Sequence, residues 1–283
     1  MKLNIAIGQI STRLGSVQDN LEKHLALAKD ASRTGAELIV FPELSLTGYV
    51  LQDMVPSVAC HADPQDPIFK HLLAASRKID MVVGFVEDDR RHRFYIASAY
   101  LSGGKVVHIH RKVYLPTYGM FDESRFYAPG TEVRAFDTRF GRLGILICED
   151  FWHASPPYLL WLDGADILFF SSASPGRGLN ESPKLASSTW VEQINRAYAN
   201  LFTVFTVHVN RTGFEDGLNF WGGSTVFDPD GNLIFQAPYF EESLAYCQVD
   251  LNQLHRTRSR LPLLRDEHPE LMEHELKRIL HGN

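Results

Sequence analysis

Three polar side chains close apolar segments of the sequence, and together they would form a complete set of groups for acyl transfer. Glu43 closes "ELIVFPE", Lys112 closes "VVHIHRK" and Cys148 closes "LGILICE". A thiol can act as a nucleophile, a carboxylate as its base, and a lysine ammonium as the cation that stabilises a thiolate or an oxyanion. Singly, each has an ordinary structural interpretation as a loop acid, a surface cation or a packed cysteine.

The surroundings of the cysteine in sequence oppose its activation. In "RLGILICEDFW", Cys148 is followed directly by Glu149 and Asp150. Neighbouring carboxylates disfavour a thiolate through like-charge repulsion. Cys148 is therefore either an inert residue at a strand end, or the rest of the chain supplies a cation and a base that activate it.

Hydrophobic periodicity predicts short strands that alternate with amphipathic helices, in a single domain of mixed α/β class. In layered folds of this class the carboxyl ends of strands commonly line the site, which suits residues at strand ends. The irregular stretch 114–132 is long enough to indicate a functional loop. Strands are expected over 3–10, 36–43, 81–87, 93–101, 105–113, 143–147, 165–173 and 201–210, a hairpin over 224–237, and helices from an N-cap at Ser16 to residue 31 and over 67–79, 156–163 and 182–199.

Composition narrows the class of protein. The chain has 283 residues, of which 45% are hydrophobic and 22% charged, and its net charge is -6, so no nucleic-acid or anionic-membrane partner is indicated. Three widely spaced cysteines argue against a disulfide framework and favour a reducing cytoplasm. The first residues do not form a signal peptide, and no apolar run has the length of a membrane span. We therefore expect a soluble cytoplasmic protein.

Four blocks of sequence carry a resemblance to a known family. The segments "FPELSLTGY", "HRKVYLPTYGMFDESRFYAPG", "ICEDFW" and "NRTG" with "FWGGSTVFDPDGN" occur in order over about residues 3–250. They resemble the nitrilase, or carbon–nitrogen hydrolase, superfamily. The resemblance implies a four-layer αββα sandwich, in homodimers or larger homo-oligomers that pack sandwich to sandwich. Residues 1–283 would be one such domain, with 251–283 as a C-terminal tail on its surface or on a partner subunit.

The same resemblance implies a catalytic assignment. Glu43, Lys112 and Cys148 correspond to the family triad, and Glu123 to a second glutamate that positions the lysine and the substrate. The backbone N–H of Glu149 would join Lys112 in an oxyanion hole. The implied reaction converts a small amide and water to a carboxylic acid and ammonia through a cysteine thioester. It needs no metal and no organic cofactor.

Within the superfamily, "LPTYGMFDE" and "CEDFW" are most similar to the glutaminase part of glutamine-dependent NAD synthetases. No ATP-pyrophosphatase segment or glycine-rich phosphate loop appears in the sequence. We therefore expect a free-standing amidase or a glutaminase subunit that serves a separate synthetase. Nitriles and carbamoyl compounds are alternative substrates. This similarity suggests as substrate contacts Tyr49, Tyr118, Glu149, Trp152 and Ser174.

Three other classes compete with this interpretation. His108 and His110 alternate on one strand face, as metal ligands often do, but no third ligand has a recognisable spacing. His153 lies five residues after Cys148 and would serve a Cys–His hydrolase. A binding or scaffold protein would keep the fold without catalysis, although the complete Glu–Lys–Cys set argues against it.

Overall fold

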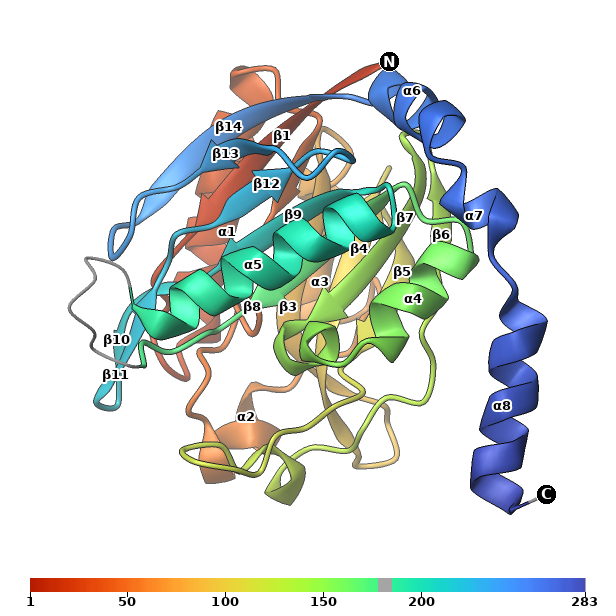
Figure 1. The fold of residues 1–283 in the computed structure, drawn as a ribbon. Helices are drawn as coiled ribbons and strands as arrows, with labels where there is room; N and C mark the ends of the chain where they lie inside the picture. Colours follow the sequence, from red (N-terminus) through yellow and green to blue (C-terminus); the bar gives the residue numbers. More distant parts are fainter. Residues whose placement is uncertain (178–184, 283) are drawn as a thin grey trace.

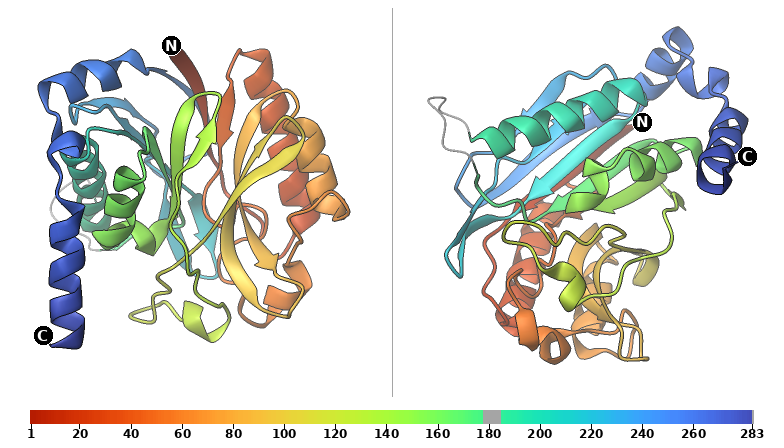
Figure 2. Two further views of the ribbon diagram at one scale, coloured as in Figure 1. Left: turned by 90° about the vertical axis from the view of Figure 1, so that its right-hand side faces the viewer. Right: turned by 60° about the horizontal axis from the view of Figure 1, so that its bottom comes forward.

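The computed structural model describes residues 1–177 and 185–282, and its centre is a pair of six-stranded sheets packed face to face (Figure 1). Helices cover the outer face of each sheet (Figure 2). These are the four αββα layers that the resemblance implies.

The first sheet has the strand order β14-β1-β2-β3-β4-β5. Strands β1, β2 and β3 pair in parallel, and the remaining pairs are antiparallel. The expected hairpin over 93–113 is confirmed as β4 and β5, joined by a tight turn at Gly103 and Gly104. The bounds are β14 (Ser243–Asp250), β1 (Lys2–Gln9), β2 (Leu38–Val40), β3 (Asp80–Asp88), β4 (Phe94–Ser102) and β5 (Lys105–Arg111).

The second sheet has the strand order β13-β12-β9-β8-β7-β6, with β7, β8 and β9 parallel. The expected hairpin over 224–237 is its edge pair β12–β13. A separate two-stranded sheet, β10–β11, follows β9. The bounds are β13 (Leu233–Gln236), β12 (Thr225–Phe227), β9 (Phe205–Asn210), β8 (Ile167–Ser172), β7 (Gly141–Ile147), β6 (Phe136–Thr138), β10 (Thr212–Glu215) and β11 (Leu218–Trp221).

Alternation of side chains along the strands builds three apolar layers. In β1, Ile5 and Ile7 point into a cluster between the sheets that includes Val207, whereas Ala6 packs beneath the first helix layer. Helices α1 (Val17–Arg33) and α3 (Pro67–Ala75) cover the first sheet, and α4 (Ser155–Leu162) and α5 (Ala186–Leu201) cover the second. The sheets are thereby fixed relative to each other, and so are their strand ends.

The C-terminal residues form three helices along one side of the molecule: α6 (Asn252–Arg260), α7 (Leu263–Asp266) and α8 (Pro269–His281). The first of them packs on the body, because Leu254 is buried and Arg258 Nη1 lies 2.7 Å from Asp166 Oδ1. Helix α8 has no buried residue. The tail therefore lies on the surface, and its last helix is the least covered.

Four expected boundaries need correction. The strand expected over 36–43 has ladder pairing only from Leu38 to Val40, since Pro42 has no N–H to donate. The helix expected to reach residue 79 ends at Ala75, where the Ser76 hydroxyl bonds the Leu73 carbonyl and accepts from Gly104 N–H. Ser16 occupies the N-cap position, but its hydroxyl donates to Asp19 and caps no N–H.

The fourth concerns the helix expected over 182–199. Its first residues, 182–184, lie outside the described part of the chain, and α5 runs on to Leu201. The strand expected over 201–210 therefore begins only at Phe205. The short elements are η1 (Gln52–Met54), α2 (Val55–Val58), η2 (Glu123–Arg125) and η3 (Cys148–Trp152). Among the helices of the described residues, none is long and apolar enough to cross a membrane.

Candidate active site

The three strand-end residues meet at one end of the paired sheets. Lys112 follows β5 directly, Cys148 follows β7 directly, and Glu43 lies three residues after β2. Lys112 Nζ is 2.8 Å from Glu43 Oε1, and both charges act on the Cys148 thiol. The first sheet thus contributes the glutamate and the lysine, and the second sheet contributes the cysteine.

Lys112 is buried between two carboxylates. Its Nζ lies 2.8 Å from Glu43 Oε1 and 2.7 Å from Glu123 Oε1, and its side chain is fully buried. Burial by itself would lower the lysine pKa, but the negative charges of Glu123 and Glu43 outweigh it and raise the pKa well above the ordinary value. Lys112 is therefore a fixed cation held in a dry site.

Cys148 has an unusual backbone conformation for its residue type. Its φ is +45°, in the left-handed region that non-glycine residues rarely adopt, and it begins η3 at the end of β7. Burial, together with the charges of Glu43, Glu123 and Glu149, raises the thiol pKa well above its ordinary value, although Lys112 acts to lower it. The resting group is a thiol rather than a thiolate, so its attack requires a base.

The Glu43 side chain is held from both sheets. One carboxylate oxygen contacts Lys112, and the other accepts a 2.8 Å hydrogen bond from the Ala173 N–H beyond β8. Gly84 in β3 makes room for this loop: a Cβ there would lie 2.3 Å from the Pro42 carbonyl oxygen. The Glu43 carboxylate is consequently held in place by Lys112 and by a backbone N–H beyond β8.

Glu123 contacts Lys112, and its carboxylate is protonated more readily than that of an ordinary glutamate. Burial and the charge of Glu43 raise its pKa to about 7, against the lowering effect of Lys112. The Tyr49 hydroxyl donates a 2.5 Å hydrogen bond to its Oε1. Its Oε2 is buried and has no hydrogen-bond partner among the described residues.

Tyr49 is anchored by an ion pair that the sequence did not indicate. Glu215 Oε1 accepts from the N–H groups of Tyr49 and Val50 at 2.7 and 2.8 Å, and its other oxygen lies 2.8 Å from Arg211 Nη1. Both charged side chains are buried, and the Arg211 guanidinium stacks on Phe220. Hydrogen bonds therefore connect β10 to Glu123 through the backbone and ring of Tyr49.

Asp150 connects the two sheets beside Cys148. Its Oδ1 accepts from the N–H groups of Val113 and Tyr114, just after Lys112, at 2.9 and 3.0 Å. Its Oδ2 accepts from Ile147 N–H at 3.0 Å and contacts His110 Nε2 at 2.8 Å. In the sequence this acid counted only as a charge that opposes the thiolate. In the fold it ties the end of β5 to the turn that carries Cys148.

The two histidines that suggested a metal site contact other protein groups instead. His110 bonds Asp150, and His108 stacks on Phe136 with ring centroids 4.3 Å apart. The described residues contain no group of three or more potential metal-ligating side chains. His153 stacks on Tyr114 at 3.7 Å, and its Nε2 lies 3.7 Å from Glu149 Oε1, so it contacts Glu149 rather than the triad.

The candidate substrate contacts have different partners in the structure. The Tyr118 hydroxyl donates to Glu149, at 3.0 and 3.1 Å from its two oxygens. Trp152 is 39% exposed and packs against Trp190, with ring centroids 6.2 Å apart. Ser174 is buried, and its N–H donates to Asn210 Oδ1. Glu149 follows Cys148 directly and accepts from Tyr118. Trp152 contacts Trp190 instead, and Ser174 contacts Asn210.

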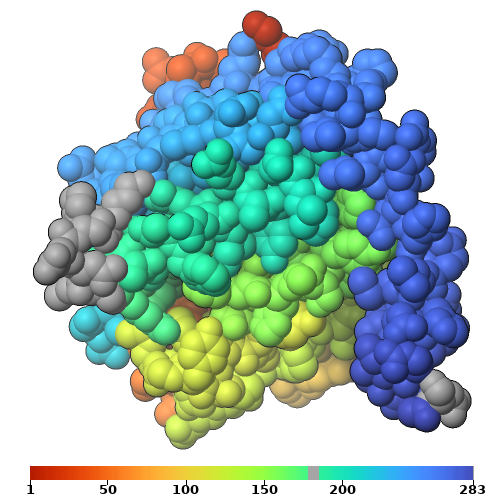
Figure 3. All heavy atoms as spheres, in the orientation of Figure 1, coloured from red at the N-terminus to blue at the C-terminus, as the bar shows by residue number. Residues whose placement is uncertain are grey.

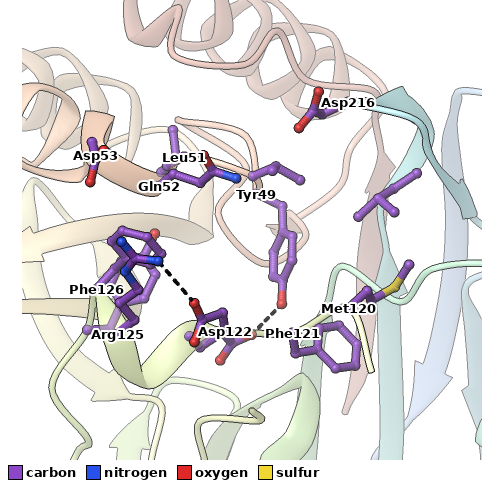
Figure 4. A pocket seen from close by; sticks show the side chains of 14 residues that line it. Tyr49, Leu51, Gln52, Asp53, Met120, Phe121, Asp122, Arg125, Phe126 and Asp216 are labelled. Atoms are coloured by element: carbon purple, nitrogen blue, oxygen red, sulfur yellow. Dashed lines mark hydrogen bonds and ion pairs between the residues drawn. The ribbon is translucent and has the colours of Figure 1, made fainter. Parts of the chain in front are cut away.

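A cavity of about 350 Å³ opens beside the Tyr49–Glu123 pair. Figure 4 shows Tyr49 pointing across it toward the loop that carries Phe121 and Asp122. Phe126, Met120 and Leu51 supply apolar surface, and Arg125 and Asp53 are polar groups at the wall. The cavity borders the buried charges on the side of Glu123.

Comparison with known proteins places the chain in a family. The carbon-nitrogen hydrolase family model matches residues 4–259. The glutamine-dependent NAD(+) synthetase of Acinetobacter baylyi is 31% identical over 250 residues, which are 88% of this chain and 44% of that protein. The chain thus spans about half the length of the curated synthetases that it matches.

Relatives of similar length exist as well. A probable nitrilase of Schizosaccharomyces pombe is 29% identical over 260 residues, which are 89% of this chain and 90% of that protein. The crystal structure of an amidase from Nesterenkonia sp. superposes with a TM-score of 0.76 at 25% identity and covers 92% of this chain and 94% of its own.

Proposed function

The chain belongs to the carbon–nitrogen hydrolase family, and from this membership we propose that it hydrolyses a small non-peptide amide to a carboxylic acid and ammonia. Cys148 is the nucleophile, Glu43 the general base and acid, and Lys112 the oxyanion cation. Glu123 and Tyr49 position Lys112. The observation that carries the proposal is the buried contact of Lys112 with both Glu43 and Glu123, beside a cysteine that begins a strained turn.

Acylation begins when Cys148 Sγ attacks the amide carbonyl carbon and the thiol proton passes to the Glu43 carboxylate. The raised thiol pKa makes this transfer necessary, since little thiolate exists at neutral pH. The tetrahedral oxyanion is bound by Lys112 Nζ and the Glu149 N–H. As the C–N bond breaks, Glu43 returns the proton to the leaving nitrogen, which departs as ammonia and leaves a thioester.

Deacylation uses the same proton transfers, with water in place of the thiol as the nucleophile. Glu43 removes a proton from the water as its oxygen attacks the thioester carbonyl. The C–S bond then breaks, and the proton returns to the Cys148 sulfur. The products are a carboxylic acid and free enzyme, and every proton transfer uses the same glutamate.

A glutamine amide is the second candidate substrate. Several curated relatives, that of Acinetobacter baylyi among them, are glutamine-dependent synthetases, and Glu149 beside the nucleophile offers a carboxylate for a substrate ammonium group. In that case the chain would supply ammonia to a separate synthetase. Nitrile and carbamoyl substrates would use the same nucleophile, base and cation and stand as alternatives. A non-catalytic scaffold would need none of these groups.

The test is ammonia release from glutamine, short aliphatic amides, carbamoyl compounds and nitriles. We expect release from at least one amide. Lys112→Ala and Cys148→Ala should reduce it to near background, by at least about 10²–10³-fold, because each removes an oxyanion donor or the nucleophile. Lys105→Ala and Cys247→Ala are matched controls outside the site and should keep wild-type rates. Turnover that survives the loss of Cys148 would contradict the proposal.

A further inference from the structure

A buried ion pair in the β10–β11 hairpin lies against the loop that carries Tyr49. Arg211 directly precedes β10 and Glu215 ends it, and their side chains are 0% and 3% exposed. Gly48 permits the close approach of this pair, because a Cβ at residue 48 would lie 2.7 Å from Glu215 Oε2. The Glu215 carboxylate is therefore packed directly on the backbone of the Tyr49 loop.

The pair is poorly arranged to stabilise the fold by its charges alone. The Nε and Nη2 atoms of Arg211 are buried and have no hydrogen-bond partner among the described residues. Taking two charges out of water is costly, and their mutual attraction offsets that cost only when the remaining donors are also hydrogen-bonded. Apolar side chains of similar size often stabilise such positions as well or better. The charges of Arg211 and Glu215 therefore indicate a role other than stability.

Glu215 holds the Tyr49 loop through its second carboxylate oxygen. Its Oε1 accepts from the N–H groups of both Tyr49 and Val50, at 2.7 and 2.8 Å. Phe220 lies on the same hairpin, 4.2 Å from the Arg211 guanidinium carbon, and its ring centroid is 6.0 Å from that of Tyr49. The hairpin thus fixes the backbone of Tyr49 by charge-assisted hydrogen bonds and contacts its ring.

The ring of Tyr49 carries this attachment to the charged groups of the site. Its hydroxyl donates to Glu123 Oε1 (dashed line in Figure 4), the same oxygen that accepts from Lys112 Nζ at 2.7 Å. A shift of the Tyr49 backbone would move this hydroxyl, and Glu123 would lose one of the two contacts that hold its Oε1. The position of Lys112 consequently depends on a hairpin that has no direct contact with it.

We propose that Glu215, held in place by Arg211, is a positioning residue: it fixes Tyr49 so that the Tyr49 hydroxyl keeps Glu123 against Lys112. This inference rests on the proposed function, in which Lys112 binds the oxyanion. A small displacement of the Lys112 ammonium weakens its contact with the transition state more than it weakens substrate binding. Loss of the Glu215 contact should therefore appear in kcat.

The experiment compares two variants that differ only in the acceptor offered to the Tyr49 loop. Both carry Arg211→Met, so that neither leaves an unpaired charge buried. Glu215→Gln in this background keeps an oxygen that can accept from the backbone N–H groups, whereas Glu215→Leu offers none. Phe214→Ser is the control, since it changes a side chain of the same strand that is 75% exposed. Urea unfolding establishes that each variant is folded.

We expect kcat of the leucine variant to be about 10- to 100-fold below that of the glutamine variant, with little change in KM. Adding Tyr49→Phe should lower kcat of the glutamine variant by a similar factor and leave that of the leucine variant nearly unchanged, because both substitutions break the same connection. If the leucine variant does not fold, Gly48→Ala takes its place, since its Cβ would displace the Glu215 carboxylate while both charges remain.

Alkylation of Cys148 by iodoacetamide gives a second measurement that needs no turnover. The charge of Lys112 acts to lower the pKa of the Cys148 thiol, so a displaced lysine should slow alkylation. The leucine variant should therefore react more slowly than the glutamine variant. Cys148→Ala gives the background from the other two cysteines.

Equal kcat and equal alkylation in the two variants would overturn the inference and leave the proposed function standing. Effects of Glu215→Leu and Tyr49→Phe that multiply would do the same, because they would show that the two residues act independently. Alkylation that depends on Glu215 through Tyr49, in a protein that hydrolyses no amide, would support the positioning role and contradict the proposed function. No hydrolysis and equal alkylation in all variants would contradict both.

Discussion

Lys112 contacts the carboxylates of Glu43 and Glu123, and Glu123 changes its protonation state near neutral pH. The Glu123 pKa is raised to about 7, first by burial and then by Glu43, with Lys112 opposing. Below that pH, Glu123 is neutral and Lys112 faces one anion. Above it, Lys112 faces two, and the burial of a second carboxylate charge weakens the folded state.

Because the Glu123 pKa is higher in the folded than in the unfolded chain, the free energy of unfolding should fall as pH rises. Between about 4.5, the ordinary glutamate pKa, and about 7, folded Glu123 holds a proton that the unfolded chain releases. The stabilising contribution of Glu123 is therefore full below this window, and it is lost as pH rises through it, by at most roughly 1.4 kcal/mol per pH unit. In Glu123→Gln this pH-dependent loss should be absent.

Urea unfolding of wild type and Glu123→Gln at several pH values from 5 to 8 measures this difference. Glu132→Gln replaces an exposed loop glutamate and serves as the control. Parallel stability curves for wild type and Glu123→Gln would show that Glu123 titrates normally.

Among the elements, the turn after β7 is hydrogen-bonded to the end of the first sheet through the Asp150 side chain. Asp150 is fully buried and accepts two N–H groups that follow β5 and one at the end of β7, besides its contact with His110. The relative positions of Lys112 and Cys148 are set by these bonds. Asparagine at this position would offer one acceptor oxygen, whereas aspartate offers two.

Asp150→Asn should therefore leave buried N–H groups without an acceptor. We expect a loss of about 2–4 kcal/mol of unfolding free energy, and a fall in kcat larger than any change in KM, because the cation and the nucleophile lose their relative alignment. Chemical unfolding and steady-state kinetics measure both. Asp137→Asn changes an aspartate that is 83% exposed and should alter neither. A stable, fully active Asp150→Asn protein would show that Asp150 is not needed to position Lys112 and Cys148.

Sequence patterns predicted the strands and hairpins well, because alternation along β4, β5 and β7 reflects burial directly. They also predicted the convergence of Glu43, Lys112 and Cys148, since all three follow apolar segments. They missed the inter-sheet contacts of Asp150, because these bonds join residues distant in sequence. They also missed the Arg211–Glu215 pair, whose residues are four apart, because its burial depends on the fold around it and not on the local pattern. The end of the helix at Ala75 was missed because a serine with a tertiary partner, Gly104, replaced the next turn.

For the whole molecule, the helix at the C-terminal end of the fold indicates an interface. Helix α8 exposes five apolar side chains: Leu271, Met272, Leu276, Ile279 and Leu280. It lies beside the body in Figure 3, and a largely apolar cavity of about 770 Å³ separates it from α4 and α5. Apolar patches of this kind mark association sites.

We expect a second copy of the chain to cover this surface, in keeping with the homo-oligomer that the family resemblance implies. Light scattering coupled to size exclusion should give a multiple of 32.0 kDa. Leu276→Glu with Ile279→Glu should shift the mass toward the monomer, because two charges would be buried in the interface. Lys29→Glu, on exposed α1, is the control. A wild-type monomer at micromolar concentration would exclude this interface.

The central claim is that the amide carbonyl becomes a thioester on Cys148, and hydroxylamine tests it most directly. Hydroxylamine competes with water for an acyl-enzyme, so the enzyme should convert an amide to its hydroxamic acid, in proportion to the hydroxylamine added, while ammonia is still released. Cys148→Ala should form none. If ammonia appears with the carboxylic acid as the only product at every hydroxylamine concentration, water attacks the amide without an acyl-enzyme, and the mechanism built on Cys148 is wrong.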